Sequence, residues 1–333
     1  MDVTLRDGGF EVGFHWDAET IAQVPASVIP LGVDVVELGY LGGVPLEHDV
    51  SSPGIGAFIT PDLVASAAAV VADGRLAAMI HPTALGTGLD LAAYARSGLD
   101  MVRLVYHPNW ADDIHRIAKQ AQACGLQVTV NIALASRYRA DELAEHVAAV
   151  CKNIAPDVLY VADTCGAMHP DQVRTLFTRL RQEVETELGF HAHDFLTLAY
   201  ANALAAAEAG ATYFDSSLLG LGRGGGNLST ELIVLRHRVP RTTTAQAVNR
   251  FLACRRHLAE LAGREHRPLT PVVCGMLNLT PVEEGALYEK ADTHRIDHDA
   301  AALFLAAAGA APSSLRDSGK APAWLPAAEA GTG

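Results

Sequence analysis

The chain has 333 residues, half of them apolar, and its formal net charge is −13. A strongly acidic chain is a poor partner for nucleic acid or for an anionic membrane, because both bind through basic surfaces. The first ten residues, MDVTLRDGGF, lack the basic and apolar regions of a signal peptide, and the five cysteines include no CxxC pair. We therefore expect a cytoplasmic protein with a large core, no disulfide framework and no thiolate zinc site.

Short runs of β-branched and apolar residues alternate along the chain with amphipathic segments. The runs that predict strands are, in chain order, 2–6, 33–40, 75–81, 101–106, 126–134, 158–163, 190–193 and 212–218. Of the helical segments between them, 170–184 places Val173, Leu176, Phe177 and Leu180 on one apolar stripe. Strands that alternate with helices pair in parallel through right-handed crossovers. Eight such units at even spacing predict an α/β fold, a closed (β/α)8 or TIM barrel, and an open doubly wound sheet is the alternative.

The barrel is expected to close near Leu235, and the rest of the chain divides further. Residues 1–238 form the predicted TIM-barrel catalytic domain. A helical C-terminal extension is predicted for 239–312, and a flexible tail for 313–333.

Polar side chains gather where the predicted strands end, which is where TIM barrels carry their chemistry. The strand ends hold Arg6, Asp7, Glu37, His81, Arg103, His107, Asn131, Asp163, Thr164, His191, His193, Asp194, Asp215 and Ser216. His191 and His193 lie two residues apart on a strand, so both can face the barrel mouth. With Asp7 they would form a site of oxygen and nitrogen ligands without sulfur, which suits Mn²⁺, Mg²⁺, Co²⁺ or Zn²⁺. An HxH pair on a strand is also compatible with two ordinary histidines.

Four segments, each at a predicted strand end, occur in the order found in one known family. They are TLRDGG (4–9), DTCGAMHPDQV (163–173), HAHDFLTLAYANALAAAEAGA (191–211) and DSSLLGLGRGGGNLSTE (215–231). Together they resemble the DRE-TIM metallolyase superfamily, and most closely its 4-hydroxy-2-oxovalerate aldolase-like members. The resemblance covers roughly residues 1–235.

The resemblance implies roles for individual residues. Asp7, His191 and His193 would be metal ligands, Asn227 would sit beside the metal, and Arg6 would stabilise an enolate oxygen. It implies a divalent-metal-dependent aldolase or lyase, with Mn²⁺ as the favoured metal. Such an enzyme makes or breaks a C–C bond next to a 2-oxo acid, through a pyruvate-type enolate and an aldehyde.

The sequence also departs from the family. Phe10 stands where the aldolases have a catalytic histidine, and their catalytic C-terminal tyrosine has no clear counterpart. The candidate replacements for proton transfer are His15, Glu37, His81 and His107. Two further expectations concern Arg223, which could bind a substrate carboxylate, and Asp194, which could orient a metal ligand.

These departures leave two other functions open. The first is a Claisen-type acyltransferase that condenses an acyl-CoA with a 2-oxo acid, although no strong basic cluster for CoA phosphates is evident. The second is a degenerate, non-catalytic barrel that acts as an interaction partner, as the loss of the histidine at Phe10 suggests. A homo-oligomer is possible. The aldehyde dehydrogenase partner of the bacterial aldolases is not predicted, because the C-terminal region has diverged.

Overall fold

The computed structural model describes residues 1–44, 50, 52–71, 73–84, 88–237, 240, 243–265, 268–309, 312–315 and 322–325. The chain forms two compact units. The first, here called the barrel unit, comprises Met1–Ala26 and Asp34–Thr230, and the second, the helical unit, comprises Ser27–Val33 and Glu231–Gly333. Most of the predicted tail, 313–333, lies outside the described residues.

A parallel sheet forms the centre of the barrel unit. Within the described residues its seven strands follow one another in chain order around the sheet. They are β1 Val35–Tyr40, β2 Arg75–Ile80, β3 Met101–Tyr106, β4 Gln127–Ile132, β5 Val158–Asp163, β6 Glu187–Ala192 and β7 Tyr213–Asp215. Aspartates before two of the strands help to fix the register: Asp100 accepts a hydrogen bond from the Leu76 N–H (2.8 Å), and Asp157 from the Val128 N–H (2.7 Å).

Residues 1–3 close the sheet into a ring, and we call this segment the seam. On one side, the Asp2 N–H donates to the Val35 carbonyl (2.8 Å), and the Asp2 carbonyl accepts from the Glu37 N–H (2.8 Å). On the other side, the Val3 N–H donates to the Ser216 carbonyl (2.7 Å). The predicted closed (β/α)8 architecture is confirmed, with the seam in the place of a full strand.

The predicted first strand, 2–6, is wrong beyond Val3. Residues 4–7 form a turn in which the Asp7 N–H donates to the Val3 carbonyl (2.8 Å). The Asp2 carboxylate accepts from the Thr4 N–H (3.0 Å), and such local side-chain bonds compete with strand pairing. The turn places Asp7 just beyond the seam.

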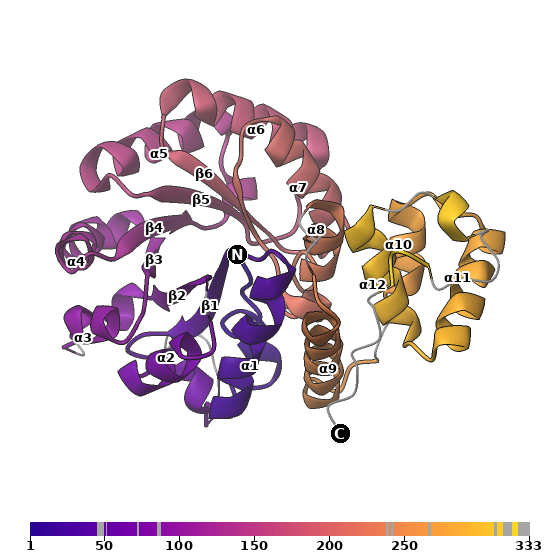
Figure 1. Ribbon diagram of the computed structural model, residues 1–333. Helices are drawn as coiled ribbons and strands as arrows, with labels where there is room; N and C mark the ends of the chain where they lie inside the picture. Colours follow the sequence, from indigo (N-terminus) through magenta and orange to yellow (C-terminus); the bar gives the residue numbers. More distant parts are fainter. Residues whose placement is uncertain are drawn as a thin grey trace. The chain divides into compact units, whose positions relative to one another are not determined.

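Helices α2 to α7 surround the strands of the barrel unit (Figure 1). The helices of the barrel unit are α1 Ala18–Val28 (up to Ala26), α2 Pro61–Ala68, α3 Leu91–Arg96, α4 Ala111–Ala123, α5 Ala140–Ile154, α6 Pro170–Glu183 and α7 Ala199–Glu208. The predicted apolar stripe of α6, which includes Val173 and Phe177, is buried. This apolar face of α6 is therefore turned to the interior of the protein.

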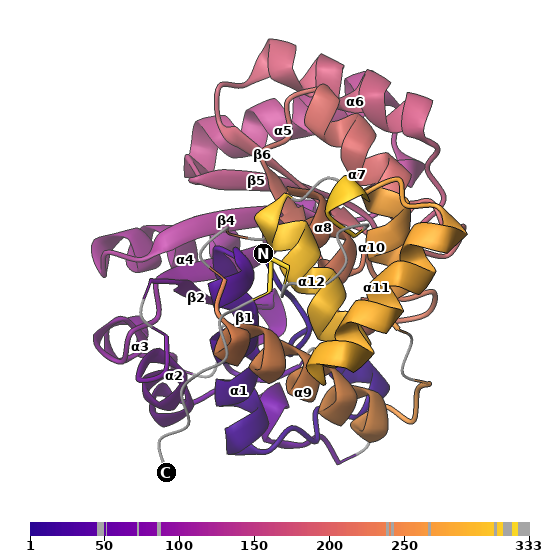
Figure 2. The same ribbon diagram turned by 45° about the vertical axis from the view of Figure 1, so that its right-hand side comes forward.

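The helical unit contains α8 Thr230–His237 from Glu231 onward, α9 Ala245–Leu261, α10 Thr270–Met276, α11 Pro281–His294 and α12 His298–Ala308. Helix α12 packs against α9, α10 and α11 (Figure 2). Arg255 of α9 is buried and donates to Glu231 (2.7 Å). Asp299 of α12 accepts from the Leu269 and Thr270 N–H groups at the start of α10 (2.8 and 2.9 Å). Within the described part of the chain, no helix is long and apolar enough to cross a membrane.

Candidate metal centre

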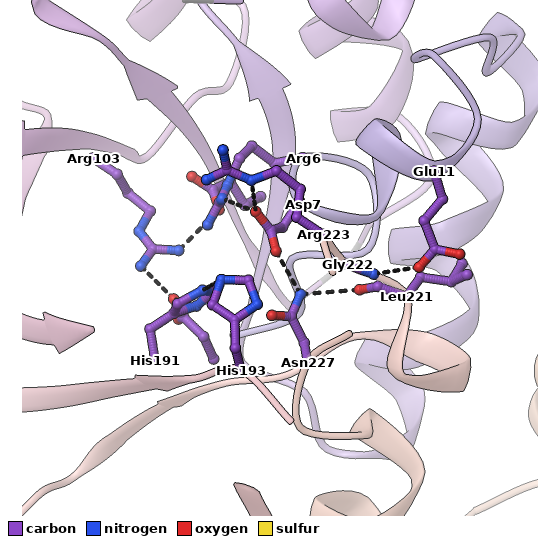
Figure 3. Close-up of polar contacts among 12 residues, drawn as sticks. Arg6, Asp7, Glu11, Arg103, His191, His193, Leu221, Gly222, Arg223 and Asn227 are labelled. Carbon is purple, nitrogen blue, oxygen red and sulfur yellow. Dashed lines mark hydrogen bonds and ion pairs between the residues drawn. The ribbon is translucent and has the colours of Figure 1, made fainter. Parts of the chain in front are cut away.

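Asp7, His191 and His193 meet at the carboxyl ends of the strands (Figure 3). One ligand atom from each of the three lies within 4.8 Å of the other two, and all three side chains are buried. The histidines come from the end of β6, and Asp7 comes from the turn after the seam. Side chains 184 and 186 positions apart in sequence thus form one cluster.

Hydrogen bonds at Nδ1 fix both histidine rings. Nδ1 of His191 lies 3.0 Å from Asp215 Oδ2, and Nδ1 of His193 lies 3.1 Å from the Gly226 carbonyl. Because carboxylates and carbonyls only accept, both Nδ1 atoms are donors, and Nε2 is the atom that each ring can offer to a metal. The two Nε2 atoms face each other at 3.4 Å.

The charge states of the cluster also suit a metal. Burial, and then His191, lower the pKa of His193 to about 4, so its ring is neutral near pH 7. Burial alone would raise the pKa of Asp7, but Arg6, His191 and His193 outweigh it and hold that pKa well below the usual range. A carboxylate and neutral imidazoles are the forms that bind a divalent cation.

Asn227 completes the arrangement around Asp7. Its Nδ2 donates to Asp7 Oδ2 (2.8 Å) and to the Leu221 carbonyl (2.9 Å). Its buried Oδ1 has no hydrogen-bond partner among the described residues. An unsatisfied buried oxygen beside the ligands is what a fourth metal ligand would present, so the residues of this centre fit a divalent metal.

Arg6 lies next to the cluster and is held by two carboxylates. Its Nη1 donates to Asp7 Oδ1 (2.6 Å) and its Nε donates to Glu37 Oε2 (2.9 Å). Glu37, at the middle of β1, is fully buried and also accepts from Arg103 (2.9 Å). The structure therefore brings Glu37 together with Arg6 as an ion-pair partner.

The three histidines predicted to transfer a proton lie on three different loops and differ in burial. His15 is exposed after the turn that carries Asp7. His81 is buried beyond β2, with Nδ1 2.8 Å from Thr83 Oγ1, and His107 is exposed beyond β3. The rings of His81 and His107 flank Trp110, with centroid distances of 5.1 and 5.4 Å. None of the three belongs to the cluster of Asp7 and the β6 histidines.

Phe10 fills its position with an aromatic ring that packs on Phe14 (4.9 Å between centroids). The Arg223 guanidinium lies over the Phe10 ring (4.6 Å), and Arg223 Nε lies 4.0 Å from Asp7 Oδ1. Arg223 therefore adds positive charge at the edge of the centre.

The residue that orients His191 is Asp215. Asp194, for which this role was expected, instead accepts from the Ala199 N–H (2.8 Å) at the start of α7. Asp215 was predicted to lie at a strand end, without a role in the site. The feature that could have indicated this role is strand register, because His191 of β6 and Asp215 of β7 are paired neighbours. The contact of His193 with the Gly226 carbonyl could not be predicted from side-chain patterns, because the acceptor is a backbone group.

The fold and the cluster of Asp7 with the two histidines define a (β/α)8 protein with a candidate divalent-metal site at the carboxyl ends of its strands. The chain belongs to the HMGL-like family, whose model matches residues 1–257. It is 34% identical over 234 residues to the 4-hydroxy-2-oxovalerate aldolase of Pelotomaculum thermopropionicum, covering 70% of this chain and 68% of that protein. It is 32% identical over 237 residues to the enzyme of the same name from Carboxydothermus hydrogenoformans, covering 70% and 68%. The predicted family resemblance is confirmed.

Solved structures support the same fold. The N-terminal domain of a putative aldolase from Bacteroides vulgatus matches with a TM-score of 0.66 and 22% identity, covering 85% of this chain and 94% of that one. The HMG-CoA lyase of Bacillus subtilis matches with a TM-score of 0.63 and 18% identity, covering 79% and 93%. At these identities the similarity concerns the barrel architecture.

Proposed function

We propose that this protein is a divalent-metal-dependent aldolase, a carbon–carbon lyase that makes or breaks a bond next to a 2-oxo acid. The observation that carries the proposal is the pair of oriented Nε2 atoms of His191 and His193 beside Asp7 and Arg6. The aldolase name of its relatives supports a pyruvate-type enolate and an aldehyde as the reacting partners. Its partners are then small molecules, and the acidic chain with its free cysteines is consistent with a cytoplasmic location and no nucleic-acid partner.

Asp7, His191 and His193 would hold the metal, with the Asn227 Oδ1 atom as a further ligand. A bound divalent metal acts as a Lewis acid that polarises the carbonyl oxygen of the substrate. We propose Mn²⁺, because a set of one carboxylate, two imidazoles and an amide oxygen matches its preference for oxygen and nitrogen ligands.

Arg6 would stabilise the enolate oxygen. Its contacts to Glu37 and Asp7 use Nε and Nη1, so the guanidinium is fixed before a substrate binds. Its Nη2 group takes part in neither of these two bonds and can donate to an oxygen on which negative charge develops. Glu37 contributes by holding Arg6 in place.

A histidine at the barrel mouth would carry the proton that the histidine at the Phe10 position carries in the aldolases. His81 and His107 follow neighbouring strands and flank Trp110, and His15 follows the Asp7 turn. Separate His15→Ala, His81→Ala and His107→Ala variants test this assignment. The variant that loses C–C bond cleavage but keeps metal binding identifies the proton-transfer group.

The two alternatives make different predictions. A Claisen-type acyltransferase would consume an acyl-CoA and release free thiol. A non-catalytic barrel would keep its cellular role when Asp7 is replaced by alanine. The aldolase names of the relatives and the retained orientation of both histidines favour the aldolase.

The test is exchange of the pyruvate methyl hydrogens in D2O, followed by NMR with the Mg²⁺-loaded protein, or with Mn²⁺ after removal of the paramagnetic ion. We expect metal-dependent deuterium incorporation that disappears in His193→Ala. An absence of exchange with every divalent ion tried, in protein shown to bind the ion, would contradict an enolising centre for pyruvate.

A further inference from the structure

Arg103 lies in the interior of the barrel and joins two parts of the candidate centre. Its Nη1 donates to Glu37 Oε2 (2.9 Å), and its Nη2 donates to Asp215 Oδ2 (2.5 Å). All three side chains are fully buried. Glu37 in turn holds Arg6, and Asp215 holds His191, so one guanidinium connects the enolate arginine to a metal ligand.

Two carboxylate oxygen atoms link Arg103 to Arg6 and to His191. Glu37 Oε2 accepts from Arg103 Nη1 and from Arg6 Nε, each at 2.9 Å. Asp215 Oδ2 accepts from Arg103 and lies 3.0 Å from His191 Nδ1. A shift of Arg103 would therefore move the same oxygen atoms that position Arg6 and His191.

The charge balance requires a cation at this position. Without Arg103, Asp215 would lose its arginine partner, and Arg6 alone would balance the buried carboxylates of Asp7 and Glu37. Arg103 is the cation that contacts both Glu37 and Asp215, at 2.9 Å from Glu37 Oε2 and 2.5 Å from Asp215 Oδ2. Breaking such a buried pair leaves an uncompensated charge, and the remaining groups must rearrange or take up a proton.

The barrel also fixes the plane of the Arg103 guanidinium. Its Cζ lies 4.5 Å from the centroid of the Tyr160 ring, which comes from β5. Gly189 on β6 makes room for that ring, because a Cβ there would lie 2.5 Å from Tyr160 ring carbons. A lysine at residue 103 would keep the charge but could not present two N–H groups in one fixed plane.

We propose that Arg103 is a positioning residue that sets the geometry of both the metal ligand His191 and the enolate arginine Arg6. This inference rests on the metal-dependent function proposed above. Arg103 has no direct contact with Asp7 or His193 among the described interactions. It acts through Asp215 on one side and through Glu37 on the other.

The experiment compares Arg103→Lys with wild type and with Arg255→Lys as a matched control. Arg255 is also a buried arginine that donates to a carboxylate, but it belongs to the helical unit. Co²⁺ titration followed by visible absorption measures metal affinity and ligand geometry without turnover. We expect Arg103→Lys to bind Co²⁺ about 10- to 100-fold more weakly and with an altered spectrum, the effect typical of residues that orient metal ligands. Arg255→Lys should titrate like wild type.

A second measurement tests the effect of Arg103 on Arg6 separately from its effect on metal binding. At saturating metal, Arg103→Lys should lower the maximal rate of pyruvate deuterium exchange about tenfold or more, because Arg6 loses its fixed position. Equal Co²⁺ affinity and an unchanged spectrum in folded Arg103→Lys would overturn the proposal. Failure of wild type itself to bind any divalent ion would instead refute the proposed function.

Tyr160→Leu tests the proposal if Arg103→Lys does not fold. It removes the ring under the guanidinium and leaves every charge in place. We expect Co²⁺ binding about two- to fivefold weaker than wild type, since only part of the support for Arg103 is lost. Wild-type Co²⁺ affinity and spectrum in Tyr160→Leu, together with an Arg103→Lys protein that does not fold, would assign Arg103 to stability alone and overturn the proposal.

Discussion

Gly222→Ala should weaken the metal centre although it changes none of the ligands. A Cβ at Gly222 would lie 2.3 Å from Asn227 Nδ2, 2.7 Å from Asn227 Cγ and 3.0 Å from Asp7 Oδ2. Carbon needs about 3.5 Å from such atoms, so the Asn227 amide would have to move by about 1 Å. That movement breaks or stretches the Asn227 bond to Asp7 (2.8 Å).

The size of the effect follows from these overlaps. Overpacking of a buried site costs about 1–3 kcal/mol of folding free energy. Displacement of a group that orients a metal ligand lowers metal affinity about 10- to 100-fold. Gly222→Ala should therefore show a lower free energy of unfolding in urea and a weaker Co²⁺ titration.

Gly275→Ala is the matched control. Gly275 lies inside α10, and a Cβ there would have no described atom within 4 Å. Alanine is the better helix former, so this variant should be as stable as wild type or up to about 1 kcal/mol more stable, with unchanged metal affinity. Wild-type Co²⁺ affinity in Gly222→Ala would refute the claim that Asn227 supports Asp7 at the metal centre.

Three further changes test other parts of the structure. Burial raises the pKa of the Asp2 carboxyl from 3.8 to about 6, so the folded state favours its neutral form. This contribution to the free energy of unfolding is complete below about pH 4 and is lost as the pH rises through 6. Asp2→Asn should remove that dependence and raise the free energy of unfolding at pH 8 by up to about 3 kcal/mol relative to wild type, measured by urea denaturation at several pH values. Removal of the metal with EDTA should lower the Tm of wild type in calorimetry. If the metal was present at 100 times its Kd, the loss corresponds to about 2.7 kcal/mol of folding free energy. The Tm of His193→Ala should not change. Thr280 accepts from the Glu283 N–H (3.3 Å) at the start of α11, so Thr280→Ala should cost about 1 kcal/mol in urea denaturation while Co²⁺ binding stays as in wild type.

The sequence predicted seven of the strands within a few residues, because each is a short β-branched or apolar run between helical segments. The bounds predicted for β3, Met101–Tyr106, and β5, Val158–Asp163, match the structure. The first predicted strand has the same kind of pattern, but hydrogen bonds from Thr4 and Asp7 to Asp2 and Val3 turn the chain. Such bonds depend on which side chain reaches which backbone group, and alternation of apolar residues does not encode that.

The candidate centre was predictable where its residues stand in short motifs. His191 and His193 share a strand face because they are two residues apart, and TLRDGG marks Asp7. The roles of Arg103 and Asp215 depend on strand register and on the barrel interior, where residues from β3 and β7 meet. The predicted catalytic roles of Arg6, His15, Glu37 and His107 stay predictions. So do the predicted metal-binding roles of Asp7, His191, His193 and Asn227.

The seam has a consequence for the order of folding. Each strand from β1 to β7 pairs with the next one in the chain, whereas the bond between Asn227 and Asp7 joins residues separated by 220 positions. Contacts of such long separation form late, because closing so long a loop costs conformational entropy that more local contacts reduce first. The two histidines lie on β6, and Asp7 follows the seam, so the pairing between the seam and the end of β7 brings them together. A bound cation would therefore stabilise only the closed ring. Metal binding would then measure the final step of folding, which is closure of the ring. Metal release would accompany the first step of unfolding, which is opening of the ring.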